Sequence, residues 1–179
     1  MDLSKHVNKY AKFLRVNEDK YDDINKIAPR VFIGNYHAAR DKNVFEKYNI
    51  KAVLNCTKDL PNSFRNRSDI EYMRIPIDDS LRETDINKLT EYFSVITRFI
   101  QKHADIQKHA ILVHCVEGSQ RSCASVVAYL MEMYGMNPYK ACETVIGRRN
   151  KAFHHGNNVN FEKSINNYYR QLSKRRQVL

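Results

Sequence analysis

The feature that most constrains this 179-residue chain is an apolar run followed by a short polar loop and a helical pattern. Residues 110–113, Ala-Ile-Leu-Val, predict a short buried strand. Residues 122–133 place apolar side chains at helical spacing and predict a helix. A strand, a tight loop and a helix in this order aim backbone N–H groups and the positive helix end at one point. We therefore expect a site for a dianion such as phosphate at the loop.

The loop reads His-Cys-Val-Glu-Gly-Ser-Gln-Arg-Ser, from His114 to Ser122, and carries the residues of a nucleophilic phosphate site. The field that binds a dianion also favours the thiolate of Cys115, so the nucleophile and the phosphate site coincide. Arg121 can bind two phosphate oxygens through its planar fork, which lysine cannot reproduce. Ser122 can donate a hydrogen bond to the sulfur or cap the following helix, and the two roles are compatible.

This loop resembles the signature of the cysteine-dependent protein phosphatases, in which Cys is followed by five residues, Arg, and Ser or Thr. The resemblance extends to residues 31–35 (Val-Phe-Ile-Gly-Asn), 52–55 (Ala-Val-Leu-Asn) and 75–79 (Ile-Pro-Ile-Asp-Asp), and it covers about residues 29 to 172. In size and motif the chain is most similar to the small cellular and poxviral dual-specificity enzymes. The resemblance implies a protein phosphatase that forms a phosphocysteine intermediate and needs neither a metal nor a cofactor.

Strands that alternate with helices imply an α/β domain with a central mixed sheet flanked by helices, the cysteine-phosphatase fold, with an extra N-terminal helix. We divide the chain into an N-terminal helical extension (1–28), a catalytic domain (29–172) and a basic C-terminal tail (173–179). Strands are expected at 31–34, 51–55, 70–75 and 110–113. Helices are expected at 3–14, from Asn35 to about Tyr48, 86–100 with Thr84 or Asp85 as cap, 122–133, 138–146 and 161–172. Residues 19–26 read as charged and turn-like, and Gly135 as a helix stop.

The phosphate-binding set is predicted to follow the loop itself. Backbone amides of residues 116–121 would cradle the phosphate oxygens. The predicted substrate-binding residues are Val116, Glu117, Gly118, Ser119, Gln120 and Arg121. Glu117 adds a carboxylate at the rim, which should repel polyanionic headgroups and RNA triphosphate ends. Gln120 stands where the family commonly has Ser, Asn or Gly.

A general acid must protonate the leaving oxygen, and the same group can later activate water. Asp78 and Asp79 are adjacent candidates. The resemblance places the family's acid at the fourth residue after the first Ile of Ile-Pro-Ile, which favours Asp79. Asp78 would then be a solvated or structural neighbour.

Three further positions are predicted to support the site. His114 is expected to be a buried orienting residue, because strand alternation points it away from the substrate. Asn158, three residues before Phe161, resembles the family's Asn-x-x-Phe element, in which the amide side chain braces the signature loop. Either Arg148 or Arg149 resembles the arginine that begins this segment, and the sequence leaves both open.

The chain has four cysteines and no CxxC pair, which argues against a zinc site and a disulfide framework. In some relatives a second cysteine traps the oxidised nucleophile as a disulfide, and Cys56 or Cys123 could do this with Cys115. The alternative for both is a small buried apolar residue. Cys142 is expected to be core.

Lys and Arg outnumber Asp and Glu by 30 to 20, so the net charge is +10. Such a surface attracts acidic phosphoproteins, nucleic acid or anionic lipid, or is simply solvated. No apolar run approaches the length of a membrane span and the N-terminus lacks the apolar core of a signal peptide, so we expect a cytoplasmic, reducing location, in a host cell or virion if the protein is viral. The amphipathic N-terminal helix is expected to pack on its own core or to form a homodimer.

The interpretation that follows is a dual-specificity protein phosphatase acting on phosphotyrosine, phosphoserine and phosphothreonine, with phosphoproteins as its partners. A polynucleotide 5′-phosphatase on the same fold is the alternative that the positive charge favours and Glu117 disfavours. A phospho-binding pseudophosphatase is a third, weaker alternative, because Cys115, Arg121 and Asp79 are all present.

Overall fold

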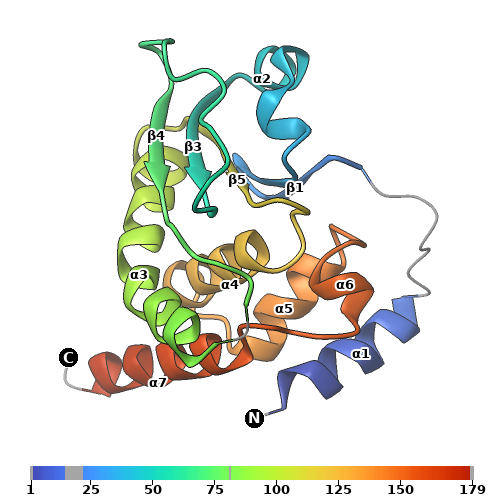
Figure 1. The fold of residues 1–179 in the computed structure, drawn as a ribbon. Coiled ribbons are helices and arrows are strands. Elements are labelled where there is room, and N and C mark those ends of the chain that lie inside the picture. Colours follow the sequence, from blue (N-terminus) through green and yellow to red (C-terminus); the bar gives the residue numbers. More distant parts are fainter. Residues whose placement is uncertain (1, 15–21, 81, 178–179) are drawn as a thin grey trace.

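The signature loop follows the central strand of a mixed sheet in the computed structural model, which describes residues 2–14, 22–80 and 82–177 (Figure 1). The strands are β1 (Ile24–Ala28), β2 (Val31–Gly34), β3 (Ile50–Asn55), β4 (Glu71–Arg74) and β5 (Ala110–His114). The α-helices are α1 (Leu3–Leu14), α2 (Lys42–Tyr48), α3 (Glu83–Gln101), α4 (Arg121–Met133), α5 (Pro138–Ile146), α6 (Phe153–Gly156) and α7 (Glu162–Gln177). A 3-10 turn (Ala38–Arg40) precedes α2, and a π-helical turn (Lys102–Ile106) follows α3.

The sheet has the strand order β1-β2-β5-β3-β4, in which β1 is antiparallel to β2 and the other pairs are parallel. Successive side chains of a strand point to opposite faces, and both faces are covered here. Ile111 and Val113 of β5 belong to the large core shared with α3, α4, α5 and α7. Leu112 belongs to a smaller core with Phe45 of α2. The expected α/β fold is confirmed.

Helix α1 packs on its own chain. Leu3, Val7 and Ala11 form its buried face, and it lies beside α5 and α6 (Figure 1). A Cβ on Gly156 of α6 would come within 2.2 Å of the Cβ of Ala11, so the two backbones approach closely. The apolar face is therefore occupied within this chain, and this arrangement gives no support to the expected homodimer through the helix.

Strand β1 was not predicted. Residues 19–26 were expected to be a charged turn, but residues 24–26 belong to β1, while 19–21 lie outside the described residues. The strand is an edge strand with only its last two residues buried, so its sequence shows little alternation. Arg30, at φ 63°, makes the tight turn into β2 that creates the antiparallel pair.

The helix expected from Asn35 to Tyr48 is two separate pieces. Asn35 Oδ1 accepts a hydrogen bond from the backbone N–H of Ala38, as a cap should, but only a 3-10 turn follows. Asp41 has an extended backbone and caps α2 by accepting from the N–H of Asn43. A second capping residue thus restarts the helix.

Two other helix ends differ from the prediction. Helix α3 begins at Glu83 with Arg82 at its N-cap, and Asp85 lies inside the first turn, where it accepts from Ser80 Oγ. Helix α7 continues past Leu172 to Gln177, so the basic residues up to Gln177 form helical turns rather than a separate tail.

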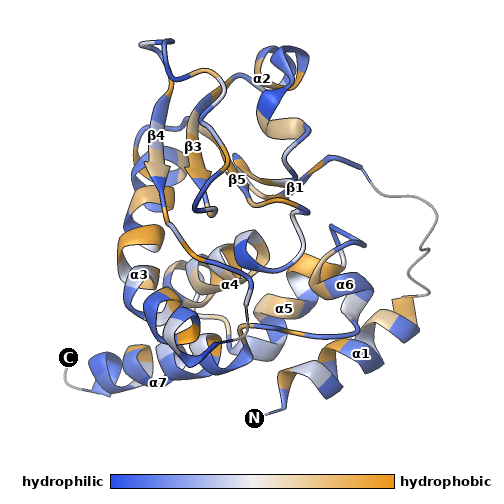
Figure 2. Ribbon diagram, viewed as in Figure 1, coloured by the Kyte–Doolittle hydropathy of each residue, from blue (hydrophilic) through white to orange (hydrophobic). Residues whose placement is uncertain are grey.

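Arg176 at that end donates to the carbonyl of Met131 at 2.9 Å. Figure 2 shows mostly hydrophilic residues along α7 and hydrophobic ones along β3 and β5. No described helix is both long and apolar enough to cross a membrane.

Candidate active site

Cys115 lies directly after β5, at the start of the loop that leads into α4. The residue is 1% exposed, and its Sγ lies 3.3 Å from Ser122 Oγ. Helix α4 begins at Arg121 with Gln120 at the N-cap, and no side chain caps it. Ser122 is therefore not the cap that the sequence allowed. Its hydroxyl is directed at the sulfur instead, which is the first of its two predicted roles.

The loop presents unpaired donors, as an anion cradle requires. Among the described residues, the backbone N–H groups of residues 116–120 donate no hydrogen bond to another protein group. Arg121 Nη1 donates to the carbonyl of Ile77 at 3.0 Å, while Arg121 Nε is buried and has no hydrogen-bond partner within the described chain. Backbone amides and a guanidinium left open in this way match the oxygens of a phosphate.

Gly118 makes the sharp turn of the loop. Its φ of 65° is rarely adopted by residues with a side chain. A Cβ there would lie 2.5 Å from both Arg149 Nη2 and the carbonyl oxygen of Gly34. Glycine is thus required both for the turn and for the close packing of the loop on its neighbours.

His114 is buried at the end of β5, as predicted. Burial lowers its pKa to about 4, so the ring is neutral at physiological pH. Its Nδ1 lies 3.4 Å from the carbonyl oxygen of Cys115. The ring therefore contacts the backbone beside the nucleophile, which fits an orienting role and not that of a base.

Ser119 and Gln120 direct their side chains away from the cradle. Ser119 Oγ donates to the carbonyl of Lys151 at 2.8 Å and accepts from the N–H of His154 at 2.9 Å. Gln120, 1% exposed, lies against the segment just before α7. Of these two predicted substrate-binding residues, only the backbone faces the site, because both side chains brace the loop from behind.

The structure distinguishes Arg148 from Arg149. Arg149, fully buried, donates through Nε to the carbonyl of Gly118 at 2.6 Å and through Nη2 to that of Glu117 at 3.3 Å. Its Nη1 reaches Asn25 Oδ1 of β1 at 2.6 Å. Arg148 instead donates to the carbonyl of Ile27. Arg149 is the arginine that holds the loop, and burial lowers its pKa below the usual value.

Asn158 does not brace the signature loop through its amide, so that prediction is wrong. The residue is exposed, and its carbonyl oxygen, not its side chain, accepts from Gln120 Nε2 at 2.8 Å. Its Nδ2 donates to Asn160 Oδ1. The long Gln120 side chain supplies the connection that the Asn side chain was expected to make.

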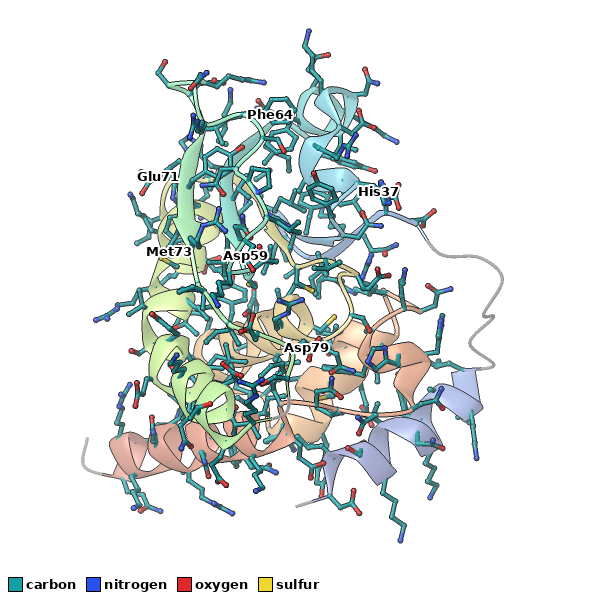
Figure 3. The ribbon with its side chains drawn as sticks, viewed as in Figure 1. His37, Asp59, Phe64, Glu71, Met73 and Asp79 are labelled. Carbon is teal, nitrogen blue, oxygen red and sulfur yellow. The ribbon has the colours of Figure 1, made fainter. Side chains whose placement is uncertain are left out.

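Asp79, not Asp78, is oriented toward the loop. Its Oδ2 lies 3.9 Å from Arg121 Nε, and its Oδ1 accepts from Asn160 Nδ2 at 2.9 Å. Asp78 is exposed. Figure 3 labels Asp79 on the connection between β4 and α3, where it passes over the central helices. This geometry agrees with the assignment of Asp79 as the acid.

Glu117 is not an isolated carboxylate at the rim. Lys151 Nζ lies 2.7 Å from Glu117 Oε2, and this contact lowers the Glu117 pKa, with smaller contributions from His37 and His154. Figure 3 labels His37 beside the connection from β2 to α2. Lys151 therefore offsets the charge of Glu117, which weakens the argument that Glu117 repels polyanions.

The other three cysteines are buried free thiols. Cys56 Sγ lies 3.5 Å from Ser125 Oγ, and burial raises the pKa of Cys56 to about 12. Cys123 Sγ contacts the carbonyl of Gly118, and burial raises its pKa as well. Cys142 is packed in the core as expected. A disulfide between Cys115 and Cys56 or Cys123 stays a prediction.

Two residues of the site, Asn160 and Lys151, were missed by the sequence reasoning. Asn160 occupies a variable position of the Asn-x-x-Phe element that begins at Asn158, and Lys151 belongs to no motif. Each reaches the site through a loop that is distant in sequence. The one available signal was Gln120, an unusual long amide next to the arginine. Such a side chain needs a partner, and Asn160 supplies it through its N–H.

Comparison with known protein families identifies the family to which the chain belongs. Residues 31–171 match the family "Dual specificity phosphatase, catalytic domain". The chain belongs to the dual-specificity phosphatase family. It is 38% identical over 119 residues to dual specificity protein phosphatase Mpk3 of Drosophila melanogaster, covering 66% of this chain and 28% of that protein. It is 31% identical over 147 residues to human dual specificity protein phosphatase 7, covering 82% and 33%.

The chain thus spans about a third of the length of these relatives, which come from animals. The poxviral part of the expected likeness stays a prediction. Among solved structures, a mouse putative dual specificity phosphatase complexed with zinc tungstate has a TM-score of 0.72 at 24% identity, with 89% of this chain and 94% of that one covered. Human DUSP28 has a TM-score of 0.70 at 23% identity, with 85% and 96% covered. These two likenesses show the fold.

Proposed function

We propose that the protein hydrolyses phosphotyrosine and phosphoserine or phosphothreonine in proteins through a phosphocysteine intermediate. The observation that carries the proposal is the signature loop, in which the Cys115 thiol, unpaired backbone N–H groups and the open Nε of Arg121 come together. Membership of the dual-specificity phosphatase family supports the same reaction.

In the first step the Cys115 sulfur attacks phosphorus. The S–P bond forms while the bond from phosphorus to the leaving oxygen breaks. Asp79 transfers a proton to that oxygen, so tyrosine, serine or threonine departs neutral. The loop amides and Arg121 hold the phosphoryl oxygens and follow their charge into the transition state.

In the second step water attacks the phosphocysteine. Asp79, now ionised, takes a proton from the water as the O–P bond forms. The S–P bond breaks and Cys115 departs as a thiolate. Ser122 Oγ, 3.3 Å from the sulfur, can donate a hydrogen bond to that developing charge. The cycle releases inorganic phosphate and restores the starting protein.

The deciding experiment compares the wild-type protein with Cys115→Ser on phosphotyrosine and phosphothreonine peptides in the presence of a metal chelator. We expect phosphate release from both peptides by the wild type and none by the variant, which should still bind the peptides. Release of phosphate from the phosphotyrosine peptide alone would contradict the proposed dual specificity. Phosphate release that persists in Cys115→Ser would show that Cys115 is not the nucleophile.

A polynucleotide 5′-phosphatase remains the second candidate, because Lys151 neutralises the carboxylate that argued against it. RNA with a 5′-triphosphate end is the substrate that separates the two. Faster turnover of this RNA than of either peptide would favour the second candidate. A pseudophosphatase that only binds phosphoproteins would be favoured by no turnover of any of the three substrates.

Phosphoproteins are accordingly the partners that we propose. A thiolate nucleophile requires a reducing compartment, and we place the reaction in the cytoplasm on that ground. The net charge of +10 would favour encounter with acidic substrates.

A further inference from the structure

The general acid sits on a segment with little structure of its own. Asp79 lies between β4 and α3, outside any helix or strand, and its side chain is 29% exposed. Within the described chain, the shortest contact of the Asp79 carboxylate is the hydrogen bond that Asn160 Nδ2 donates to its Oδ1, at 2.9 Å. The direction of this carboxylate therefore depends on Asn160.

Asn160 is itself held by the signature loop. Its backbone N–H donates to Gln120 Oε1 at 3.0 Å, and Gln120 Nε2 donates to the carbonyl of Asn158 at 2.8 Å. The buried Gln120 amide thus hydrogen-bonds to the backbone at both ends of the segment 158–160. Asn158 Nδ2 donates to Asn160 Oδ1, which leaves Asn160 Nδ2 to face Asp79.

This arrangement also selects the oxygen that carries the proton. An oxygen that accepts from an N–H group cannot direct its own proton at that group, so Oδ1 is the carbonyl-type oxygen of the neutral acid. The proton then resides on Oδ2, the oxygen nearer to Arg121 Nε. Arg121 is the phosphate-binding residue, so Oδ2 is on the side where the leaving oxygen must lie.

We propose that Asn160 is a positioning residue for the general acid, and that Gln120 ties it to the signature loop. The inference rests on the proposed function, because it assigns the proton donor of that reaction. Its consequence is that the nucleophile and the acid are held at a set separation by side-chain amides. Such support matters because catalytic groups must be held within about 0.5 Å of their productive geometry.

The test is the variant Asn160→Ala, compared on two substrates. The first is a phosphotyrosine peptide, whose leaving group needs protonation, and the second is p-nitrophenyl phosphate, whose leaving group does not. We expect kcat/KM for the peptide to fall about 10- to 30-fold, which is part of the 10²–10⁴-fold acceleration that general acid catalysis supplies. We expect kcat/KM for p-nitrophenyl phosphate to change less than about threefold. Asn157→Ala, an exposed neighbour in the same segment, is the matched control and should change neither.

A second measurement separates positioning from a merely structural role. In an Asp79→Asn background, adding Asn160→Ala should cause no further loss, because the group that it positions can no longer donate a proton. A loss of equal size on both substrates would overturn the inference, and so would a loss that persists in that background. A wild-type protein inactive on both substrates would instead overturn the proposed function, and this inference with it.

Discussion

The two halves of the candidate site are held in different ways. The nucleophile half lies between the central strand β5 and helix α4, and Cys115, Arg121 and the supporting Arg149 are all buried. The acid half is a partly exposed segment between β4 and α3, and Asp79 depends on a hydrogen bond from Asn160. The first half is part of the core, whereas the second is attached to it.

The difference follows from what each half must do. A phosphate cradle is made of backbone N–H groups, whose directions are set by the loop and by the core beneath it. A proton donor must approach a leaving group that enters from solvent, so it is placed on an accessible segment. Damage to the nucleophile half should therefore affect every substrate, and damage to the acid half only those with poor leaving groups.

The largest effect is expected from Gly118→Ala. A Cβ there would meet Arg149 and the carbonyl of Gly34 at 2.5 Å, so the cradle must deform. We expect kcat/KM to fall about 1,000-fold, or about 4 kcal/mol, for good and poor leaving groups alike. Gly135→Ala is the matched control, since its φ of 66° is equivalent and no atom lies within 4 Å of its Cβ. Equal losses in the two variants would show that backbone strain alone is responsible.

Arg149→Met should destabilise the protein by about 4 kcal/mol in urea unfolding. The change removes the guanidinium donors from the carbonyls of Gly118 and Glu117, and it leaves only the weak Cys123 thiol on the buried Gly118 carbonyl. Arg148→Met is the control, because that side chain is bonded to the carbonyl of Ile27 and not to the loop. It should cost about 1 kcal/mol. A difference between the two variants of less than 1 kcal/mol would contradict the role given to Arg149.

His114 should make stability depend on pH. Its pKa is lowered by burial from 6.5 to about 4, so below pH 6.5 the unfolded chain binds more protons than the folded one. Stability is therefore lost as the pH falls from 6.5 to 4, by about 3 kcal/mol in total. Urea unfolding at several pH values should show this slope in the wild type and a shallower one in His114→Asn. Parallel slopes would mean that the ring is not buried in its neutral form.

The smallest effect is expected from Glu117→Gln. The ion pair with Lys151 involves a side chain that is 61% exposed, and such pairs contribute about 0.5 kcal/mol or less. The change removes the negative charge beside Lys151, so inhibition by the polyanion heparin should strengthen about threefold. Glu83→Gln, at the start of α3, removes the same charge from an exposed ion pair with Lys163 and serves as the control. If both variants respond equally to heparin, net charge and not the rim is responsible.

Several elements were predictable because their causes are local. The helical spacing of Leu3, Val7 and Tyr10 predicted α1, and Pro138 correctly marked the start of α5. The helix stop at Gly135, with φ 66°, is also as expected. The 3-10 turn before α2 and strand β1 were missed, because a second cap and an edge pairing leave little trace in hydrophobic periodicity.

The sequence by itself determined the chemistry of the nucleophile half. Strand, loop and helix are contiguous in residues 110–133, so their local geometry places Cys115 beside Ser122 and opens the loop amides. Only the tertiary structure decided what supports that loop. Arg149 and not Arg148 contacts the loop, and the Gln120 side chain makes the connection that was expected of the Asn158 amide. Both contacts join segments 30 to 40 residues apart. The physical reason is that a hydrogen bond between distant segments depends on how helices and strands pack, and neither partner's local sequence contains that information.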